Sequence, residues 1–346
     1  MGNRVLRTMD TIPVPNSSRE ILLTNVDPDT SQHQASLIVF FLVLQFIGLF
    51  GGIIIILTAR FYSPIQRHAT WYNFMLSWVI SSISYTLLLF GGQIDLSGDS
   101  KGVPFGLCVL QSSVIYAAPP LSAAAVLGMV AQIWFSVHLT LFKKPFKSQK
   151  LLTKLLLILP YVLFVAISAE ALAFGLAQPD SVRVAGSGMY CNSGLAIPGR
   201  ISAGIVAVVL FPAVIIEIFL VVSLRKHWDV FKSPGSNPSR TNGMLHTIIR
   251  VFLFSIFGIF ALILSVFFFF TIHHGAALNI VISIIPVVAV CIFGSQKDLV
   301  DAWMFWKWDW VKKRRLTHSR TVSESDSTLG SPISLYDEKD LPPLPA

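Results

Sequence analysis

The chain has 346 residues, of which 53% are hydrophobic and only 13% are charged, and its formal net charge at pH 7 is +8. Soluble globular domains carry about 25% charged residues. This composition, with a mean hydropathy of +0.68, therefore excludes an ordinary soluble protein. We expect membrane lipids as the main surroundings of the chain, and no nucleic-acid partner.

Seven stretches are long and apolar enough to cross a bilayer, because a helical span needs about 20 mostly apolar residues. The runs are continuous, whereas the strands of a membrane barrel are short and alternate in polarity. The sequence therefore predicts an all-α membrane protein with a seven-transmembrane helix bundle at residues 35–294. The predicted spans are residues 35–59, 71–90, 108–142, 152–177, 201–224, 248–272 and 276–293.

The distribution of Lys and Arg predicts the orientation, because cytoplasmic loops are enriched in these residues. With the N-terminus outside, most of the 26 basic residues fall on the inner side. We therefore expect a plasma-membrane protein with an extracellular tail at residues 1–34. That tail contains an acceptor triplet for N-glycosylation at Asn16. The basic residues left outside are Arg4, Arg7, Arg19, Lys101, Arg183 and Arg200.

Small residues and prolines suggest how the spans pack. The stretch GLFGG at residues 48–52 fits a contact between helices that is built from small residues, although such patterns also arise by chance in apolar helices. The third span contains Pro119 and Pro120. Because proline removes a helical hydrogen bond, we expect the upper portion of this span to be bent or broken.

Two cysteines fall on the predicted outer side, which is the oxidising side where disulfides persist. Cys108 begins the third span, and Cys191 lies in the loop between the fourth and fifth spans. We expect a disulfide between them, with two unpaired cysteines as the alternative. Cys291 lies inside the last span and is expected to be a small apolar residue.

Ionisable residues inside a membrane are costly, so each is a candidate functional residue. Glu170 lies toward the outer half of the fourth span, and His273 and His274 cap the outer end of the sixth. One interpretation places these three with Tyr116 in a ligand pocket and makes Glu217, in the inner half of the fifth span, part of a switch. The other has both glutamates satisfied by neighbouring helices or by the membrane interface.

A basic rim on the predicted inner face has two interpretations. It would dock an acidic partner protein, or it would contact anionic lipid headgroups, as in many membrane proteins. The rim consists of Lys143, Lys144, Lys147, Arg225 and Lys226.

Two stretches carry a resemblance to a known family: RHATWYNFMLSWVISSISYTLLLFGGQ at residues 67–93 and FGSQKDLVDAW at residues 293–303. With seven predicted spans and the outer cysteines, the chain resembles G-protein-coupled-receptor-like proteins of mushroom-forming fungi. It is more distantly similar to fungal lipopeptide-pheromone receptors. The resemblance implies an extracellular ligand and a heterotrimeric G protein as partner. The chain departs from common animal receptors at QIWFSVHLTLF, residues 132–142, where those receptors carry an acidic-Arg-aromatic triplet.

Four of the eight tryptophans lie in WMFWKWDW, residues 303–310. On a helical wheel Trp303, Trp306 and Trp310 share one face, which predicts an amphipathic interfacial helix at residues 295–311 that anchors the end of the bundle. Residues 312–346 are Ser- and Pro-rich, and we expect a disordered cytoplasmic tail. Its partners would be a kinase and, at LPPLP (residues 341–345), an SH3 or WW module. The phosphorylation candidates are Thr317, Ser319, Thr321, Ser323, Ser325 and Ser327.

The polar parts of the chain show no metal-ligand cluster, no nucleophile–base pair and no phosphate-binding loop. We therefore expect no enzyme activity, no catalytic residue, no metal and no cofactor. The sequence favours a G-protein-coupled-receptor-like membrane receptor that signals through its cytoplasmic loops. A seven-helix lipid-handling or transport protein without G-protein coupling is the alternative, and a scaffold that presents the tail is a third.

Overall fold

The computed structural model describes residues 28–61, 67–91, 103–142, 148–185, 187–226, 253, 256–267, 269–270 and 276–304. The chain divides into two units, Met1–Ser295 and Gln296–Ala346, and each is considered by itself. Several predicted sites lie outside the described residues. They are Asn16, Lys143, Lys144, Lys147, His273, His274, Trp306, Trp310 and the phosphorylation candidates Thr317, Ser319, Thr321, Ser323, Ser325 and Ser327.

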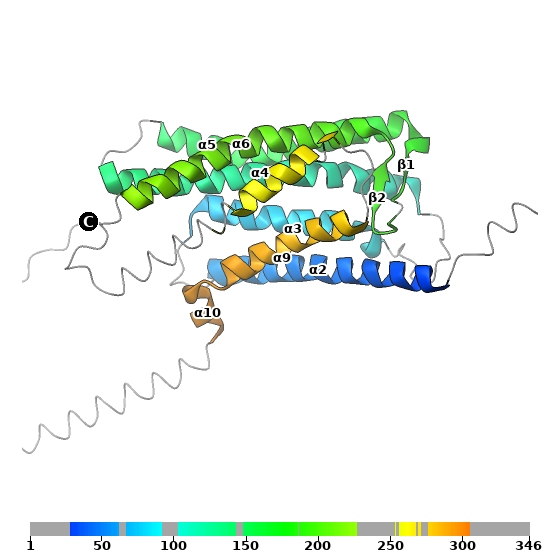
Figure 1. Ribbon diagram of the computed structural model, residues 1–346, viewed down its shortest axis with the longest axis horizontal. Coiled ribbons are helices and arrows are strands. Elements are labelled where there is room, and N and C mark those ends of the chain that lie inside the picture. Colours follow the sequence, from blue (N-terminus) through cyan, green and yellow to red (C-terminus); the bar gives the residue numbers. More distant parts are fainter. Residues whose placement is uncertain are drawn as a thin grey trace, which may run out of the picture. The chain divides into compact units, whose positions relative to one another are not determined.

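The first unit is built from long apolar helices, as the sequence predicts (Figure 1). Five of them are long and apolar enough to cross a membrane. Two further apolar helices, Ile256–Phe267 and α9 (Ala276–Gly294), coincide with the sixth and seventh predicted spans but have shorter described apolar segments. The helical fold class is therefore confirmed, whereas the number of seven spans stays a prediction. The five long helices are α2 (Pro28–Phe61), α3 (Ala69–Phe90), α4 (Phe105–Phe142), α5 (Gln149–Ala177) and α6 (Ala196–Lys226).

Helix α4 is the central helix of the unit. It packs against α3, α5 and α6, while α2 packs against α3 and α9. In the apolar stretch of α4, 78% of the residues are buried, compared with 22% in the apolar stretch of α5. Apolar side chains of α5 such as Val162 and Val165 are exposed. An exposed apolar face of this extent fits contact with lipid, so the helices differ in environment although they are similar in composition.

Close approach of α2 to its neighbours depends on glycines. A Cβ atom added at Gly51 would lie 2.6 Å from Cγ1 of Val290 in α9, and one at Gly52 would lie 2.8 Å from Cγ2 of Val79 in α3. One added at Gly48 would lie 2.7 Å from Cβ of Pro286. The predicted small-residue contact at residues 48–52 is therefore present.

The prolines of α4 do not break it, so of the two expectations only the bent helix stays a prediction. The helix is continuous from Phe105 to Phe142. Pro120 has no N–H to give to the carbonyl of Tyr116, four residues earlier. The hydroxyl of Ser202 in α6 donates to that carbonyl instead, at 2.6 Å. A neighbouring helix thus satisfies the oxygen that the proline leaves without its usual helical partner.

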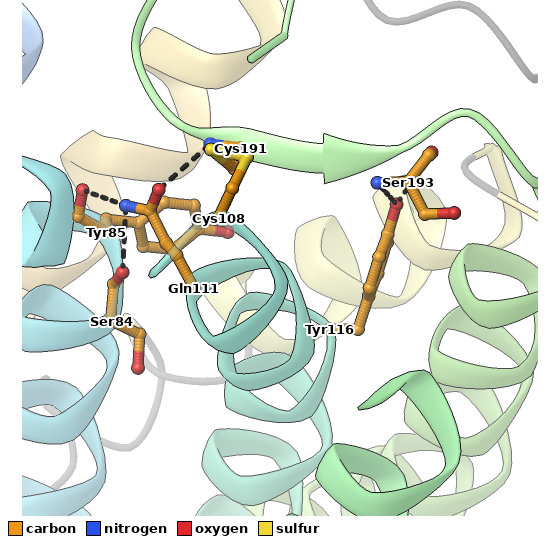
Figure 2. The surroundings of a disulfide bond; sticks show 7 residues. All are labelled: Ser84, Tyr85, Cys108, Gln111, Tyr116, Cys191 and Ser193. Atoms are coloured by element: carbon orange, nitrogen blue, oxygen red, sulfur yellow. Dashed lines mark hydrogen bonds between the residues drawn. A yellow bond between two sulfur atoms is a disulfide. The ribbon is translucent and has the colours of Figure 1, made fainter. Parts of the chain in front are cut away.

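A short hairpin joins α5 to α6. It follows a 3₁₀ turn (Pro179–Ser181) and consists of β1 (Val182–Val184) and β2 (Cys191–Ser193), which pair antiparallel with Val184 opposite Cys191. Its turn contains Gly188, whose φ of 70° favours glycine. This β1–β2 hairpin places Cys191 and Ser193 beside the start of α4 (Figure 2).

The second unit contains helix α10 (Lys297–Trp303), which lies within the predicted interfacial helix. Trp303 is partly exposed. The described residues of this unit end at Met304, so the anchoring face predicted from three tryptophans stays a prediction.

Candidate ligand-binding site

The β1–β2 hairpin is attached covalently to the bundle. A disulfide joins Cys108, in the first turn of α4, to Cys191 in β2. Both cysteines are buried, together with Leu88 of α3. The disulfide predicted from the sequence is therefore present, and it fixes one strand of the hairpin to the central helix.

Gln111 reinforces this attachment (Figure 2). It lies about one turn beyond Cys108 and is fully buried. Its Oε1 accepts a hydrogen bond of 2.9 Å from the main-chain N–H of Cys191. Its Nε2 donates to the carbonyls of Ser84 and Tyr85, at 3.4 and 3.3 Å. One side chain of α4 therefore connects the hairpin to the end of α3.

Tyr116 makes a second polar contact with the hairpin, two strand residues further on (Figure 2). Its hydroxyl donates to the carbonyl of Ser193 at 3.2 Å and accepts from the N–H of Ser193 at 3.3 Å. Because β2 is held at Cys191 and again at Ser193, its position over α4 is fixed in both translation and rotation.

Tyr190 connects the hairpin to α9 and α2. Its hydroxyl donates to Oδ1 of Asn279 at 2.8 Å. Its ring lies 6.3 Å from that of Phe41 in α2 and 5.6 Å from that of Tyr85 in α3, centre to centre. Burial raises the pKa of the Tyr190 phenol above its ordinary value of 10.0, and the nearby Tyr85 and Tyr116 act in the same direction. Tyr190 therefore remains a neutral hydrogen-bond donor at physiological pH.

Next to the hairpin lies a cavity of about 960 Å³. Residues from α2, α3, α4, the hairpin, α6, the helix Ile256–Phe267 and α9 line it. Two of them, Arg183 of β1 and Arg200 of α6, are exposed, so the cavity reaches the surface at the hairpin. No Asp or Glu is among the described lining residues. The exposed end of the cavity thus carries positive charge.

The interior of the cavity is mostly apolar, and Phe74 and Phe293 line it with ring centres 5.0 Å apart. Several polar lining residues interrupt this apolar surface, and three of them carry unpaired atoms. Both amide atoms of Gln45, Nε1 of Trp78 and Oγ of Ser122 are buried, and none has a hydrogen-bond partner among the described residues. Buried polar groups are normally paired, so a ligand group that reaches these atoms would supply the partner they lack.

The structure brings together only part of the pocket predicted from the sequence. Tyr116 lines the cavity, whereas Glu170 of α5 is not among its lining residues. The carboxylate of Glu170 has no hydrogen-bond partner among the described residues. Arg225 and Lys226, candidates for the inner rim, are exposed in the last turn of α6. Sequence reasoning missed several residues of the site: Gln45, Trp78, Gln111, Ser122, Arg183 and Arg200.

Glu217 lies in the same bundle, outside the described lining of the cavity. It is 2% exposed, and a Cβ added at Gly258 would lie 3.2 Å from its Oε2. The carboxylate of Glu217 in α6 therefore packs against Gly258, where the helix Ile256–Phe267 has no side chain.

Among the described residues no group of three His, Cys, Asp or Glu side chains forms a metal site. No protein-family model matches the chain, and no curated protein is significantly similar to it. The cavity beside the disulfide-bonded hairpin is therefore the feature from which a function is inferred.

Proposed function

We propose that this protein is a seven-helix membrane receptor that binds a small extracellular ligand in the cavity beside the β1–β2 hairpin. The observation that carries the proposal is the cavity itself. Its volume of about 960 Å³ lies within the range of small-molecule sites, roughly 300–1,000 Å³. It is mainly apolar with a few polar groups, as such sites usually are.

The orientation proposed for the receptor places the hairpin outside the cell. The Cys108–Cys191 disulfide supports this orientation, because disulfides persist in oxidising compartments. The same side is outside according to the distribution of Lys and Arg in the sequence. A ligand from the extracellular medium would then enter at Arg183 and Arg200.

The signalling step follows from how many helices line the cavity. A ligand in the cavity touches α3, α4, α6 and α9 together. If it binds one arrangement of these helices more tightly than another, it shifts the equilibrium toward that arrangement. Glu217 of α6 and Gly258 of the helix Ile256–Phe267, which also lines the cavity, lie in contact, and we assign them to the moving part. The cytoplasmic loops would pass the change to a heterotrimeric G protein.

Guanine-nucleotide exchange on a co-expressed Gα tests this function. Membranes that contain the full chain should show faster exchange when an extract contains the ligand, and membranes with Gα alone should not. Absence of exchange with every extract and every Gα tried would contradict receptor function.

A lipid-handling or transport protein is the second candidate. The apolar depth of the cavity, down to Phe74 and Phe293, favours it. Flux of lipid or solute across liposomes that contain the purified chain, without any exchange on Gα, would support this candidate over the receptor.

A further inference from the structure

We infer that the cavity takes an amphipathic ligand with an anionic head group and a hydroxyl part-way along an apolar chain, as in a hydroxylated fatty acid. This inference rests on the proposed ligand site and specifies its chemistry. Three features of the described residues carry it: the charge at the exposed end, the apolar length and the unpaired polar groups at intermediate depth.

The exposed end of the cavity selects for negative charge. Arg183 and Arg200 both line it, and no described lining residue is acidic. A guanidinium is always charged and binds a carboxylate through two parallel hydrogen bonds. A cationic head group would meet repulsion there without a compensating carboxylate. The anionic head of the ligand is therefore placed between these two arginines.

The depth of the cavity fits a chain rather than a compact molecule. Tyr85 lies beside the hairpin, and Phe74 lies further along the same helix α3; both line the cavity. A helix rises 1.5 Å per residue, so Phe74 is about 16 Å further from the hairpin than Tyr85. Phe74, Leu210, Phe257 and Phe293 contribute apolar surface. An apolar chain that fills this length gains free energy from burial of its surface.

The unpaired polar groups lie between these two ends. Gln45 is about one turn of α2 beyond Phe41, which packs on Tyr190 of the hairpin. Trp78 and Ser122 lie roughly 10 Å and 9 Å along their helices from Tyr85 and Tyr116. All three therefore lie at a similar intermediate depth.

The chemistry of these groups fits a hydroxyl. The Trp78 N–H only donates, whereas the Gln45 amide and the Ser122 hydroxyl both donate and accept. A hydroxyl accepts one hydrogen bond and donates another, so it complements both the donors and the acceptors of this set. No charged residue lines the cavity near this depth among the described residues, so the group is neutral. An unpaired buried polar atom is destabilising, and a chain without oxygen would leave these atoms unpaired.

The test measures binding to the full chain in lipid nanodiscs, with empty nanodiscs to subtract partitioning. The probes are dodecanoate, dodecanoate with a mid-chain hydroxyl, the methyl ester of the hydroxylated acid, and dodecyltrimethylammonium. The hydroxylated acid should bind about three- to ten-fold more tightly than dodecanoate, as expected for one added hydrogen bond. Both acids should bind more tightly than the ester and the cation.

Matched variants assign each preference to its residue. Gln45→Met keeps the size of the side chain, and it should reduce the hydroxyl preference to less than about two-fold. Gln132→Met is the control, because Gln132 of α4 does not line the cavity. Arg183→Gln with Arg200→Gln should remove the preference for the acid over its ester. Arg60→Gln, in the last turn of α2, should leave that preference unchanged.

The outcomes separate failure of this inference from failure of the proposed function. Equal binding of the cation and dodecanoate, or equal binding of the two acids to the unaltered chain, would overturn the inference and leave a ligand cavity in place. A thiol probe covers the case in which no amphiphile binds. Ser81 lines the cavity, so Ser81→Cys in a Cys291→Ala background should react with a small thiol reagent. Reaction without protection by any amphiphile overturns the inference alone, whereas absence of reaction also contradicts an accessible ligand cavity.

Discussion

The side-chain hydroxyl of Ser202 donates a 2.6 Å hydrogen bond to the main-chain carbonyl of Tyr116. This carbonyl is the one that Pro120 deprives of its helical partner. The same Tyr116 holds the hairpin through its phenol. The contact therefore joins α6, the central helix α4 and the hairpin at the cavity, and it satisfies the carbonyl that Pro120 leaves without a helical partner.

Replacement of Ser202 by alanine should lower the free energy of unfolding by about 1–3 kcal/mol, because it leaves the partly buried carbonyl of Tyr116 without its partner. Thermal unfolding of the purified chain in detergent measures the change. Ser136→Ala is the control. The Ser136 hydroxyl is exposed and donates to the carbonyl of Gln132 in its own helix, and that carbonyl is not one that a proline deprives of its partner.

A double-mutant cycle tests the role of the proline. Pro120→Ala restores an N–H that can bond to the Tyr116 carbonyl, so Ser202→Ala should cost much less in that background. An equal cost in both backgrounds would show that Ser202 does not replace the missing helical hydrogen bond.

Loss of the hairpin disulfide should destabilise the protein by about 2–5 kcal/mol. The variant is Cys108→Ser with Cys191→Ser, and ligand binding should weaken with it because the hairpin lines the cavity. The third cysteine supplies the control. Cys291 is exposed and forms no disulfide, so Cys291→Ser should leave the melting temperature unchanged. A doubly substituted chain as stable as the wild type would contradict a structural role for the disulfide.

Gly51→Ala should destabilise the contact of α2 with α9. The new Cβ would lie 2.6 Å from Cγ1 of Val290, and overpacking of this kind costs about 1–3 kcal/mol. Gly106→Ala is the matched control, because a Cβ there meets nothing within 4 Å. Alanine otherwise favours helix over glycine by about 1 kcal/mol. Melting temperatures should fall for the first variant and stay equal or rise for the second, and the reverse order would contradict this packing.

Tyr190 should make stability fall at high pH. Its pKa in the folded protein is raised above the ordinary 10.0, chiefly by burial. The unfolded chain therefore releases this proton at lower pH than the folded one, so the stabilisation present below pH 10 declines as pH rises beyond it. Chemical unfolding at a series of pH values should show a shallower decline for Tyr190→Phe than for the wild type. Identical slopes would mean that the phenol is not protected from solvent.

Much of the architecture could be predicted because it depends on local sequence. Long apolar runs predict the five long helices, since the length needed to cross a bilayer is a local property. The stretch at residues 48–52 predicts a small-residue contact, and the structure contains it. The continuity of α4 could not be predicted, because Ser202, which satisfies the carbonyl, lies 86 residues from Tyr116 in the sequence.

The site was harder to predict than the fold for the same reason. Gln45 interrupts the apolar run FFLVLQFIGLF, which was an available signal, but sequence alone does not show which side of a helix faces a cavity. Arg183 and Arg200 both belong to the predicted outer loop between the fourth and fifth spans. The place of Arg183 at the cavity depends on the disulfide and on Gln111, which fix the hairpin over residues distant in sequence.

The most direct test of the account compares two alanine substitutions in guanine-nucleotide exchange on a co-expressed Gα. Ala123 lines the cavity, whereas Ala169 is exposed on α5 and does not. A stimulus, either hydroxylated dodecanoate or an active extract, should accelerate exchange with the wild type and with Ala169→Leu. It should fail with Ala123→Leu, although that variant reaches the membrane and melts within a few degrees of the wild type. Equal stimulation of all three chains would contradict a ligand site in this cavity.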